Sequence, residues 1–123
     1  MLIPYNEDYE KITMGLLSYI PHLKEPARLA EELGLYENDP SRTIYLWQNA
    51  ETSNLIAVVG IEEEEELVLL RHIAIDPSFR NEGLIYVILD KLVEKVNGKS
   101  IVGTLETASV VSSWQKTKTE NGK

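Results

Sequence analysis

The chain has 123 residues, a formal net charge of −8 and no cysteine. A nucleic-acid-binding surface needs clustered lysine and arginine to neutralise phosphates, so the acidic balance argues against nucleic acid as a partner. The lack of cysteine excludes a disulfide framework, a thiolate nucleophile and a cysteine-based zinc site, and no apolar run approaches the length of a membrane span. We expect one cytoplasmic domain over residues 1–116 and a polar C-terminal tail over residues 117–123, with no metal site and no membrane contact.

The first forty residues predict a short strand and two helices. Residues 1–5 are interpreted as an edge strand or strand end, because Pro4 has no backbone donor. Apolar side chains recur at helical spacing over residues 8–20, and Pro21 ends that pattern. A second helix is predicted over residues 26–36, since proline is well tolerated in a first helical turn.

The middle of the chain changes to the pattern of strands. Three apolar runs, at residues 43–48, 55–61 and 67–75, are separated by a polar turn and by the glutamate run at 62–66. We interpret the three runs as consecutive antiparallel strands. The third is apolar at nearly every position, which is typical of a central strand covered on both faces. The glutamate run is interpreted as a solvated turn that offers a carboxylate to Arg71.

The last third of the chain predicts a helix, a strand and a final short helix. The helix covers residues 84–97 and the strand residues 100–105, while Thr107 caps a last helix that runs through Trp114. Two helices, three antiparallel strands, a strand–loop–helix–strand unit and a last helix together indicate an α+β fold. Its sheet is expected to be mixed, mainly antiparallel and flanked by helices.

One loop carries a functional signal. Arg80-Asn81-Glu82-Gly83 lies between the strand at 67–75 and the helix at 84–97. A helix N-terminus has unpaired N–H groups and partial positive charge. Glycine allows backbone to approach a phosphate closely, and arginine supplies a planar fork for its oxygens. The loop therefore predicts a site for a phosphate-bearing cofactor.

The residues around this loop resemble a known family. The segment from Leu69 to Leu84, a strand followed by Asp76-Pro77 and then Arg80-Asn81-Glu82-Gly83, is similar to motif A of the GCN5-related N-acetyltransferases (GNAT superfamily). The resemblance implies a GNAT-like fold with a shortened C-terminus, and an acetyl-CoA-dependent N-acetyltransferase acting on a small amine. More narrowly, residues 11–18 and 71–73 resemble the RibT proteins of riboflavin operons, which implies a link to riboflavin metabolism.

The resemblance also implies a binding site. Acetyl-CoA would lie where two parallel strands separate, with its pantetheine arm on one strand and its pyrophosphate on the Arg80 loop. The implied cofactor-binding residues are Ile73, Ala74, Ile75, Arg80, Asn81, Glu82, Gly83, Leu84, Ile85, Thr107 and Ser109. The chain departs from the family pattern at three positions. Leu69 stands where many members have a glutamate that acts as general base, and Trp114 where many have a tyrosine that acts as general acid. Ile85 stands where a second glycine or alanine is usual.

Two residues are candidate proton-transfer groups. His72 is the side chain of this strand whose ordinary pKa lies near neutrality, and Glu106 follows the next strand near the expected separation. Each also has a structural interpretation, as a buried hydrogen-bonded histidine and as an exposed strand-end glutamate. Two other functions stay open: a non-catalytic CoA-binding module, and a protein-interaction module without cofactor. A homodimer is one way to cover the edge of a shortened sheet.

Overall fold

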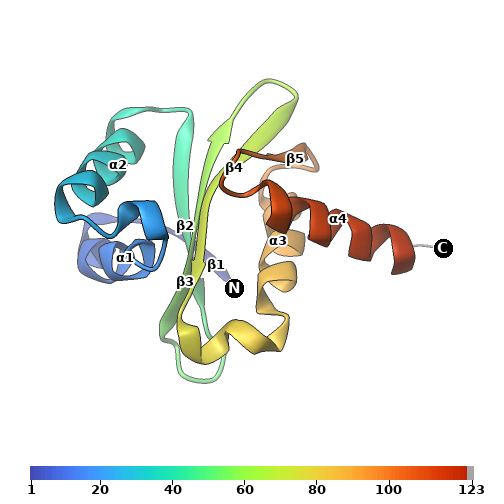
Figure 1. The fold of residues 1–123 in the computed structure, drawn as a ribbon, viewed down its shortest axis with the longest axis horizontal. Coiled ribbons are helices and arrows are strands. Elements are labelled where there is room, and N and C mark those ends of the chain that lie inside the picture. Colours follow the sequence, from blue (N-terminus) through green and yellow to red (C-terminus); the bar gives the residue numbers. More distant parts are fainter. Residues whose placement is uncertain (122–123) are drawn as a thin grey trace.

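The computed structural model describes residues 1–121, except for the side chains of residues 81, 82, 120 and 121. The described residues form one sheet in the order β1-β2-β3-β4-β5 between two layers of helices (Figure 1). The strands are β1 (Leu2–Pro4), β2 (Arg42–Gln48), β3 (Leu55–Glu63), β4 (Leu67–Ile75) and β5 (Ser100–Gly103). The helices are α1 (Glu10–Leu17), α2 (Pro26–Asn38), α3 (Leu84–Lys95) and α4 (Ala108–Asn121), with short 3-10 helices η1 (Glu7–Tyr9), η2 (Pro21–Leu23) and η3 (Pro77–Glu82).

The pairing of the strands confirms the predicted mixed sheet. Strands β1 to β4 pair antiparallel in chain order, and β5 pairs parallel to β4. The connection between the two parallel strands is supplied by η3 and α3, as the strand–loop–helix–strand pattern indicates. Connections of this type are almost always right-handed.

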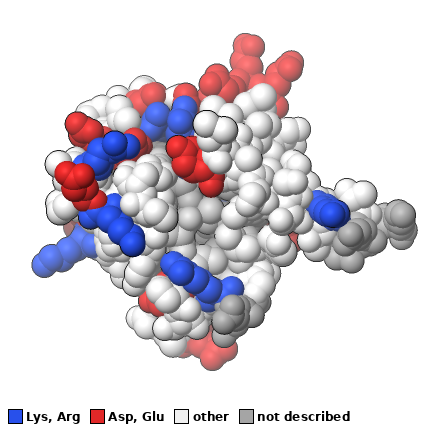
Figure 2. All heavy atoms as spheres, in the orientation of Figure 1, with Lys and Arg blue, Asp and Glu red and all other residues white. Residues whose placement is uncertain are grey.

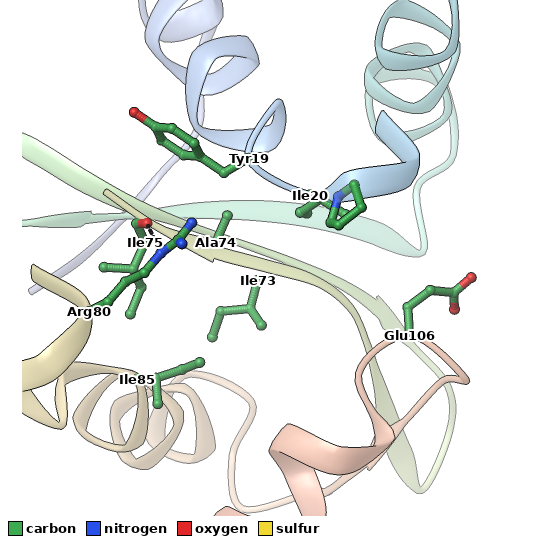
Figure 3. A pocket seen from close by; sticks show the side chains of 9 residues that line it. Tyr19, Ile20, Ile73, Ala74, Ile75, Arg80, Ile85 and Glu106 are labelled. Carbon is green, nitrogen blue, oxygen red and sulfur yellow. Dashed lines mark hydrogen bonds between the residues drawn. The ribbon is translucent and has the colours of Figure 1, made fainter. Parts of the chain in front are cut away.

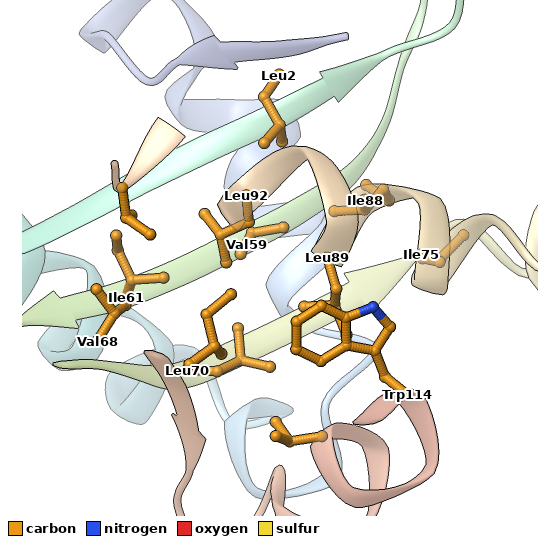
Figure 4. Close-up of a cluster of buried hydrophobic side chains, with 14 residues drawn as sticks. Leu2, Val59, Ile61, Val68, Leu70, Ile75, Ile88, Leu89, Leu92 and Trp114 are labelled. Atoms are coloured by element: carbon orange, nitrogen blue, oxygen red, sulfur yellow. The ribbon is translucent and has the colours of Figure 1, made fainter. Parts of the chain in front are cut away.

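Two hydrophobic cores explain why the central strands are almost wholly apolar. Helices α1 and α2 cover one face of the sheet, and α3 and α4 cover the other (Figure 1). Along β3, Val58 packs with the α1–α2 core, whereas Val59 and Ile61 pack with the α3–α4 core drawn in Figure 4. Because successive side chains of a strand point to opposite faces, a strand buried on both sides is apolar at every position.

The first helix is shorter than the sequence predicts. It ends at Leu17 rather than Ile20, and Ile20 is extended, with a φ of −78° and a ψ of 122°. The residue before a proline is disfavoured in the α-helical region, so Pro21 forces the chain out of the helix before the proline itself. The residues released from the helix turn toward the sheet, where they become part of the site described below.

The C-terminal elements also differ in length from the prediction. Strand β5 ends at Gly103 rather than residue 105, and Thr104 N–H instead donates to Thr107 Oγ1 in a turn. Helix α4 continues past Trp114 to Asn121, so residues 117–121 of the expected polar tail are helical, and residues 122–123 lie outside the described part. Polar residues without glycine or proline contain no stop signal, which is why the helix continues.

The described helices were also assessed as membrane spans. None of them combines the length and the apolar character that crossing a bilayer requires.

Candidate active site

The parallel strands β4 and β5 separate after four residue pairs. Their pairing runs from Leu67–Ser100 to Leu70–Gly103 and stops there. The next residue of β4, Arg71, is the extra residue of a β-bulge, since Leu70 pairs with Ile61 of β3 and His72 pairs with Gly60. A bulge bends its strand and ends regular pairing. It therefore opens the sheet between β4 and β5 at this point.

Backbone groups of β4 face the opening. Asp76 N–H donates to the Ile56 carbonyl of β3 at 2.8 Å. Because residues of an antiparallel ladder alternate between the two neighbours, Ala74 also directs its backbone groups toward β3, whereas Ile73 and Ile75 direct theirs toward the open side. Both residues belong to the strand on which the family resemblance implies that the pantetheine arm lies.

A cleft of about 400 Å³ occupies this opening. Figure 2 shows a hollow near the middle of one face, with charged side chains at its rim, and Figure 3 shows the cleft from close by. Its walls come from the end of α1 and the following turn, from β4, from α3 and from the loop after β5. The lining residues are Tyr19, Ile20, Pro21, Ile73, Ala74, Ile75, Arg80, Ile85 and Glu106.

Arg80 lies at one end of the cleft. Its Nε donates to the Ile75 carbonyl at 3.3 Å, and its Cζ lies 5.6 Å from the centroid of the Tyr19 ring (Figure 3). Gly83 follows with a φ of +69°, a left-handed conformation that favours glycine, and a Cβ there would have no neighbour within 4 Å among the described atoms. This turn exposes the start of α3, where Leu84 and Ile85 begin the helix. The side chains of residues 81 and 82 lie outside the described part.

Glu106 lies at the opposite end of the cleft from Arg80 (Figure 3). Thr104 Oγ1 donates to its Oε2 at 3.1 Å. Hydrogen bonds from its own backbone N–H and from Thr104 lower the pKa of the Glu106 carboxyl below its usual range. The carboxylate is therefore ionised at neutral pH and exposed to solvent at the rim.

His72 is buried beneath the α2 face rather than exposed in the cleft. Its side chain is 5% exposed, and its Nδ1 forms a 2.5 Å hydrogen bond with the Tyr36 hydroxyl. Burial, with additional repulsion from His22 and two arginines, lowers the pKa of His72 to about 4. Glu32 Oε2 lies 3.8 Å from its Nε2, a distance that would suit an ion pair only with a protonated ring. Because burial dominates, we assign a neutral ring.

The remaining sequence predictions fall beside the cleft. The Thr107 hydroxyl donates to the Leu70 carbonyl at 2.6 Å and fastens the loop after β5 to the last paired residue of β4. Neither Thr107 nor Ser109 is among the described residues that line the cleft. Trp114 is 4% exposed, and its Nε1 donates at 2.9 Å to Oδ1 of Asp90, which is exposed. Arg71 pairs with Glu62 at 2.6 Å, which confirms the predicted carboxylate partner.

Sequence reasoning missed one wall of the cleft. Tyr19, Ile20 and Pro21 enter it because α1 ends early. The signal was present in Pro21 itself, since a residue before proline leaves the helical region. Their approach to β4, however, depends on how α1 packs on the sheet.

A sequence relative identifies the family. A protein of Bacillus methanolicus described as an "uncharacterized N-acetyltransferase in lysA 3'region" is 33% identical over 112 residues, which cover 90% of this chain and 92% of the relative. This chain belongs to the GNAT superfamily of N-acetyltransferases. No protein-family model matches it.

Solved GNAT enzymes share the fold at low sequence identity. The aminoglycoside 6'-N-acetyltransferase AAC(6')-Ih of Acinetobacter baumannii superposes with a TM-score of 0.67 at 14% identity, over 94% of this chain and 87% of that one. The ribosomal-protein-alanine N-acetyltransferase of Brucella melitensis gives 0.67 at 15% identity, over 85% and 81%. AAC(6')-Iy, in complex with the bisubstrate analogue CoA-S-monomethyl-acetylneamine, gives 0.64 at 15% identity, over 98% and 87%.

The described residues fit acetyl-CoA, and a CoA-based bisubstrate analogue is bound by AAC(6')-Iy, which shares this fold. The free edge of β4 offers backbone groups to the amides of pantetheine, and the left-handed Gly83 with Arg80 suits a pyrophosphate. Ile85, which departs from the family pattern, lines the cleft rather than pointing away from it. The side chain narrows the cleft without filling it, because about 400 Å³ remains.

Proposed function

We propose that this GNAT enzyme transfers the acetyl group of acetyl-CoA to the amine of a small molecule bound between η2, β4 and the loop after β5. The observation that carries the proposal is the open edge of β4, with Ile73 and Ile75 facing a cleft that has Arg80 at one end. Acetyl-CoA supplies an activated acetyl group as a thioester. The residues of this chain bind it, orient it and handle the proton of the amine.

Three parts of the chain hold the donor in this proposal. The backbone of Ile73 and Ile75 hydrogen-bonds the pantetheine arm, while the N–H groups from Arg80 to Ile85 and the Arg80 guanidinium hold the pyrophosphate. Residues 81 and 82 contribute only their backbone to this argument. Thr107 and Ser109 are proposed to flank the far side of the donor, with Thr107 acting through the turn that it fixes.

Proton removal is assigned to the other end of the cleft. An alkylamine has a pKa near 10.4 and is mostly protonated at neutral pH, so it needs a proton acceptor or a desolvating pocket. The lining supplies apolar walls from Ile20, Pro21 and Ile73, which disfavour the charged amine. Ionised Glu106 is the proposed acceptor at the rim. His72 stays a second candidate, although its geometry favours the role argued in the next subsection.

Calorimetric titration with acetyl-CoA, followed by thiol release with a panel of amines, tests this function. The panel includes an aminoglycoside, a peptide with N-terminal alanine and amine-bearing riboflavin precursors. Binding with thiol release on any amine supports the proposal. Binding with a silent panel favours the CoA-binding module, for which the family departures at Leu69, Ile85 and Trp114 are the argument. No heat up to millimolar acetyl-CoA leaves only an interaction role.

Three narrower points belong to the same proposal. The riboflavin link rests on the likeness of residues 11–18 and 71–73 to RibT proteins, and the riboflavin precursors in the panel test it. A homodimer is favoured by the edge strand β5, near which Leu105 is 98% exposed, and sedimentation measures it. A cytoplasmic location agrees with a composition free of cysteine.

Replacing Arg80 by alanine is expected to weaken acetyl-CoA binding about tenfold, since a charge-assisted hydrogen bond contributes roughly 1.5–3 kcal/mol at most sites and this side chain is partly solvated. The dissociation constant from calorimetry measures the effect. Arg28→Ala is the matched control, because Arg28 is an exposed arginine of α2 that does not line the cleft. Equal affinities of the Arg80 variant and the unaltered protein would contradict the placement of the pyrophosphate.

A further inference from the structure

A hydrogen bond joins two elements distant in sequence next to Ile73, a residue that lines the cleft. Tyr36 projects from α2 and meets His72 on β4, with ring centroids 5.6 Å apart and an interplanar angle of 63°. Tyr36 is 7% exposed and His72 is 5% exposed, so the bond between them is shielded from water. A buried bond of this kind holds its two elements in a defined relative position.

The protonation states define the direction of this bond. Burial, the largest influence, raises the pKa of the Tyr36 phenol above its ordinary value, so the hydroxyl keeps its proton. His72 is neutral, as argued above. The Tyr36 hydroxyl therefore donates to Nδ1, and the ring proton of His72 lies on Nε2, which faces Glu32 at 3.8 Å.

The sheet has a gap that admits the Tyr36 hydroxyl. Gly60 of β3 pairs with His72, and a Cβ added at Gly60 would lie 2.1 Å from Tyr36 Oη and 2.5 Å from its Cζ. Only glycine leaves room for the ring at this point. A glycine inside a strand often marks such a close approach, and here it lets Tyr36 of α2 reach the His72 side chain on β4.

The position of His72 gives this contact its consequence. His72 directly follows Arg71, the extra residue of the β4 bulge, and directly precedes Ile73. Within the described part of the chain, the pairing of β4 with β5 stops at Leu70, one residue before the bulge. The hydrogen bond of His72 to Tyr36 therefore connects α2 to β4 at the residue that follows the bulge.

Charged residues of the same region hold α2 in place. The Cζ of Arg42, on β2, lies 5.5 Å from the centroid of the Tyr36 ring. The Nη1 of the same arginine lies 3.7 Å from Glu32 Oε2. Glu32 precedes Tyr36 by one helical turn, so both side chains of α2 point at the same part of the sheet. The Tyr36 side chain thus contacts His72 through its hydroxyl and Arg42 through its ring.

We propose that Tyr36 is a positioning residue: its hydroxyl, acting through His72, fixes the β4 bulge and thereby the two backbone positions, Ile73 and Ile75, that face the cleft. This proposal rests on the proposed function only where acetyl-CoA affinity is concerned. The geometry of the bulge itself is a property of the protein without ligand.

Tyr36→Phe tests the proposal with two readouts. Amide resonances of Ile73 to Ile75 report the bulge without ligand and are expected to shift and to broaden. Calorimetry with acetyl-CoA is expected to show about tenfold weaker binding, measured where the variant remains folded. Tyr5→Phe is the matched control, because it removes the Tyr5 hydroxyl that donates to Glu37 of the same helix at 3.1 Å, on the exposed surface. It is expected to leave both readouts unchanged.

A double-mutant cycle shows whether the two residues act as a unit. His72→Leu is expected to match Tyr36→Phe in both readouts, and the double variant is expected to be no worse than either single one. Additive losses would overturn the proposal, as would a Tyr36→Phe variant that retains the amide shifts of Ile73 to Ile75. If the unaltered protein gives no heat with acetyl-CoA, the proposed function fails, while the amide shifts still decide the role of Tyr36.

Discussion

Replacing Gly103 by alanine is expected to destabilise the protein by about 2–3 kcal/mol, the range of overpacking in a closely packed site. Gly103 ends β5, and a Cβ there would lie 2.8 Å from the Cα of Ala108 and 3.0 Å from its N. Both are backbone atoms at the start of α4, so no side-chain rotation relieves the contact. The start of α4 must move, and with it the hydrogen bond from Thr107 to the Leu70 carbonyl.

Thermal or urea unfolding measures this loss. A change of that size corresponds to a melting temperature lower by roughly 10 °C for a chain of this length. Gly34→Ala is the matched control: Gly34 lies inside α2, a Cβ there has no neighbour within 4 Å, and alanine is the better helix former. The control is expected to be as stable as the unaltered protein or slightly more so. A Gly103→Ala variant of equal stability would contradict the tight contact between β5 and α4.

Acidification is expected to destabilise the protein through His72 by up to about 3 kcal/mol, at about 1.4 kcal/mol for each pH unit between the two pKa values. In the unfolded chain the histidine takes up a proton near pH 6.5, whereas burial lowers its pKa in the folded protein to about 4. Between these values the unfolded state binds more protons than the native state. Above pH 6.5 the protonation of His72 therefore leaves the free energy of unfolding unchanged. As the pH falls from 6.5 toward 4, the free energy of unfolding decreases.

The comparison of two proteins isolates this effect. Urea unfolding at pH 7 and pH 4.5 is measured for the unaltered protein and for His72→Asn, which keeps an acceptor for the Tyr36 hydroxyl but does not titrate. Carboxylates contribute to acid destabilisation in both proteins, so the difference between the two pH dependences belongs to His72. The variant is expected to lose about 2 kcal/mol less than the unaltered protein. Equal pH dependences would mean that folding leaves the pKa of His72 unchanged. A smaller loss in the unaltered protein than in the variant would favour a protonated His72 paired with Glu32, at the 3.8 Å separation seen here.

Much of the fold followed from local patterns. The helical period over residues 84–95 and the apolar run of β4 agree with the structure, because each depends on neighbours close in sequence. The glutamate run forms a turn only after Glu63, because β3 extends to that residue. The cofactor loop was predicted for the same reason: proline, arginine and glycine at fixed spacing are a local signal. The predicted ends of elements were less accurate. Strand β5 stops where β4 bends away from it, and helix α4 extends beyond Trp114 to Asn121.

The residues of the site likewise fall into those that local sequence patterns indicated and those that depend on tertiary contacts. The local sequence, through its resemblance to the GNAT motif, pointed to the residues of β4, Arg80, Ile85 and Glu106, which line one cleft. Only the tertiary structure decided that Tyr19 completes the cleft, and that His72 is turned toward Tyr36 instead of the solvent. Those contacts join residues far apart in the chain, such as positions 36, 60 and 72. The energies of these contacts depend on burial and on how the helices pack against a bulged strand. Local sequence patterns do not predict either of these.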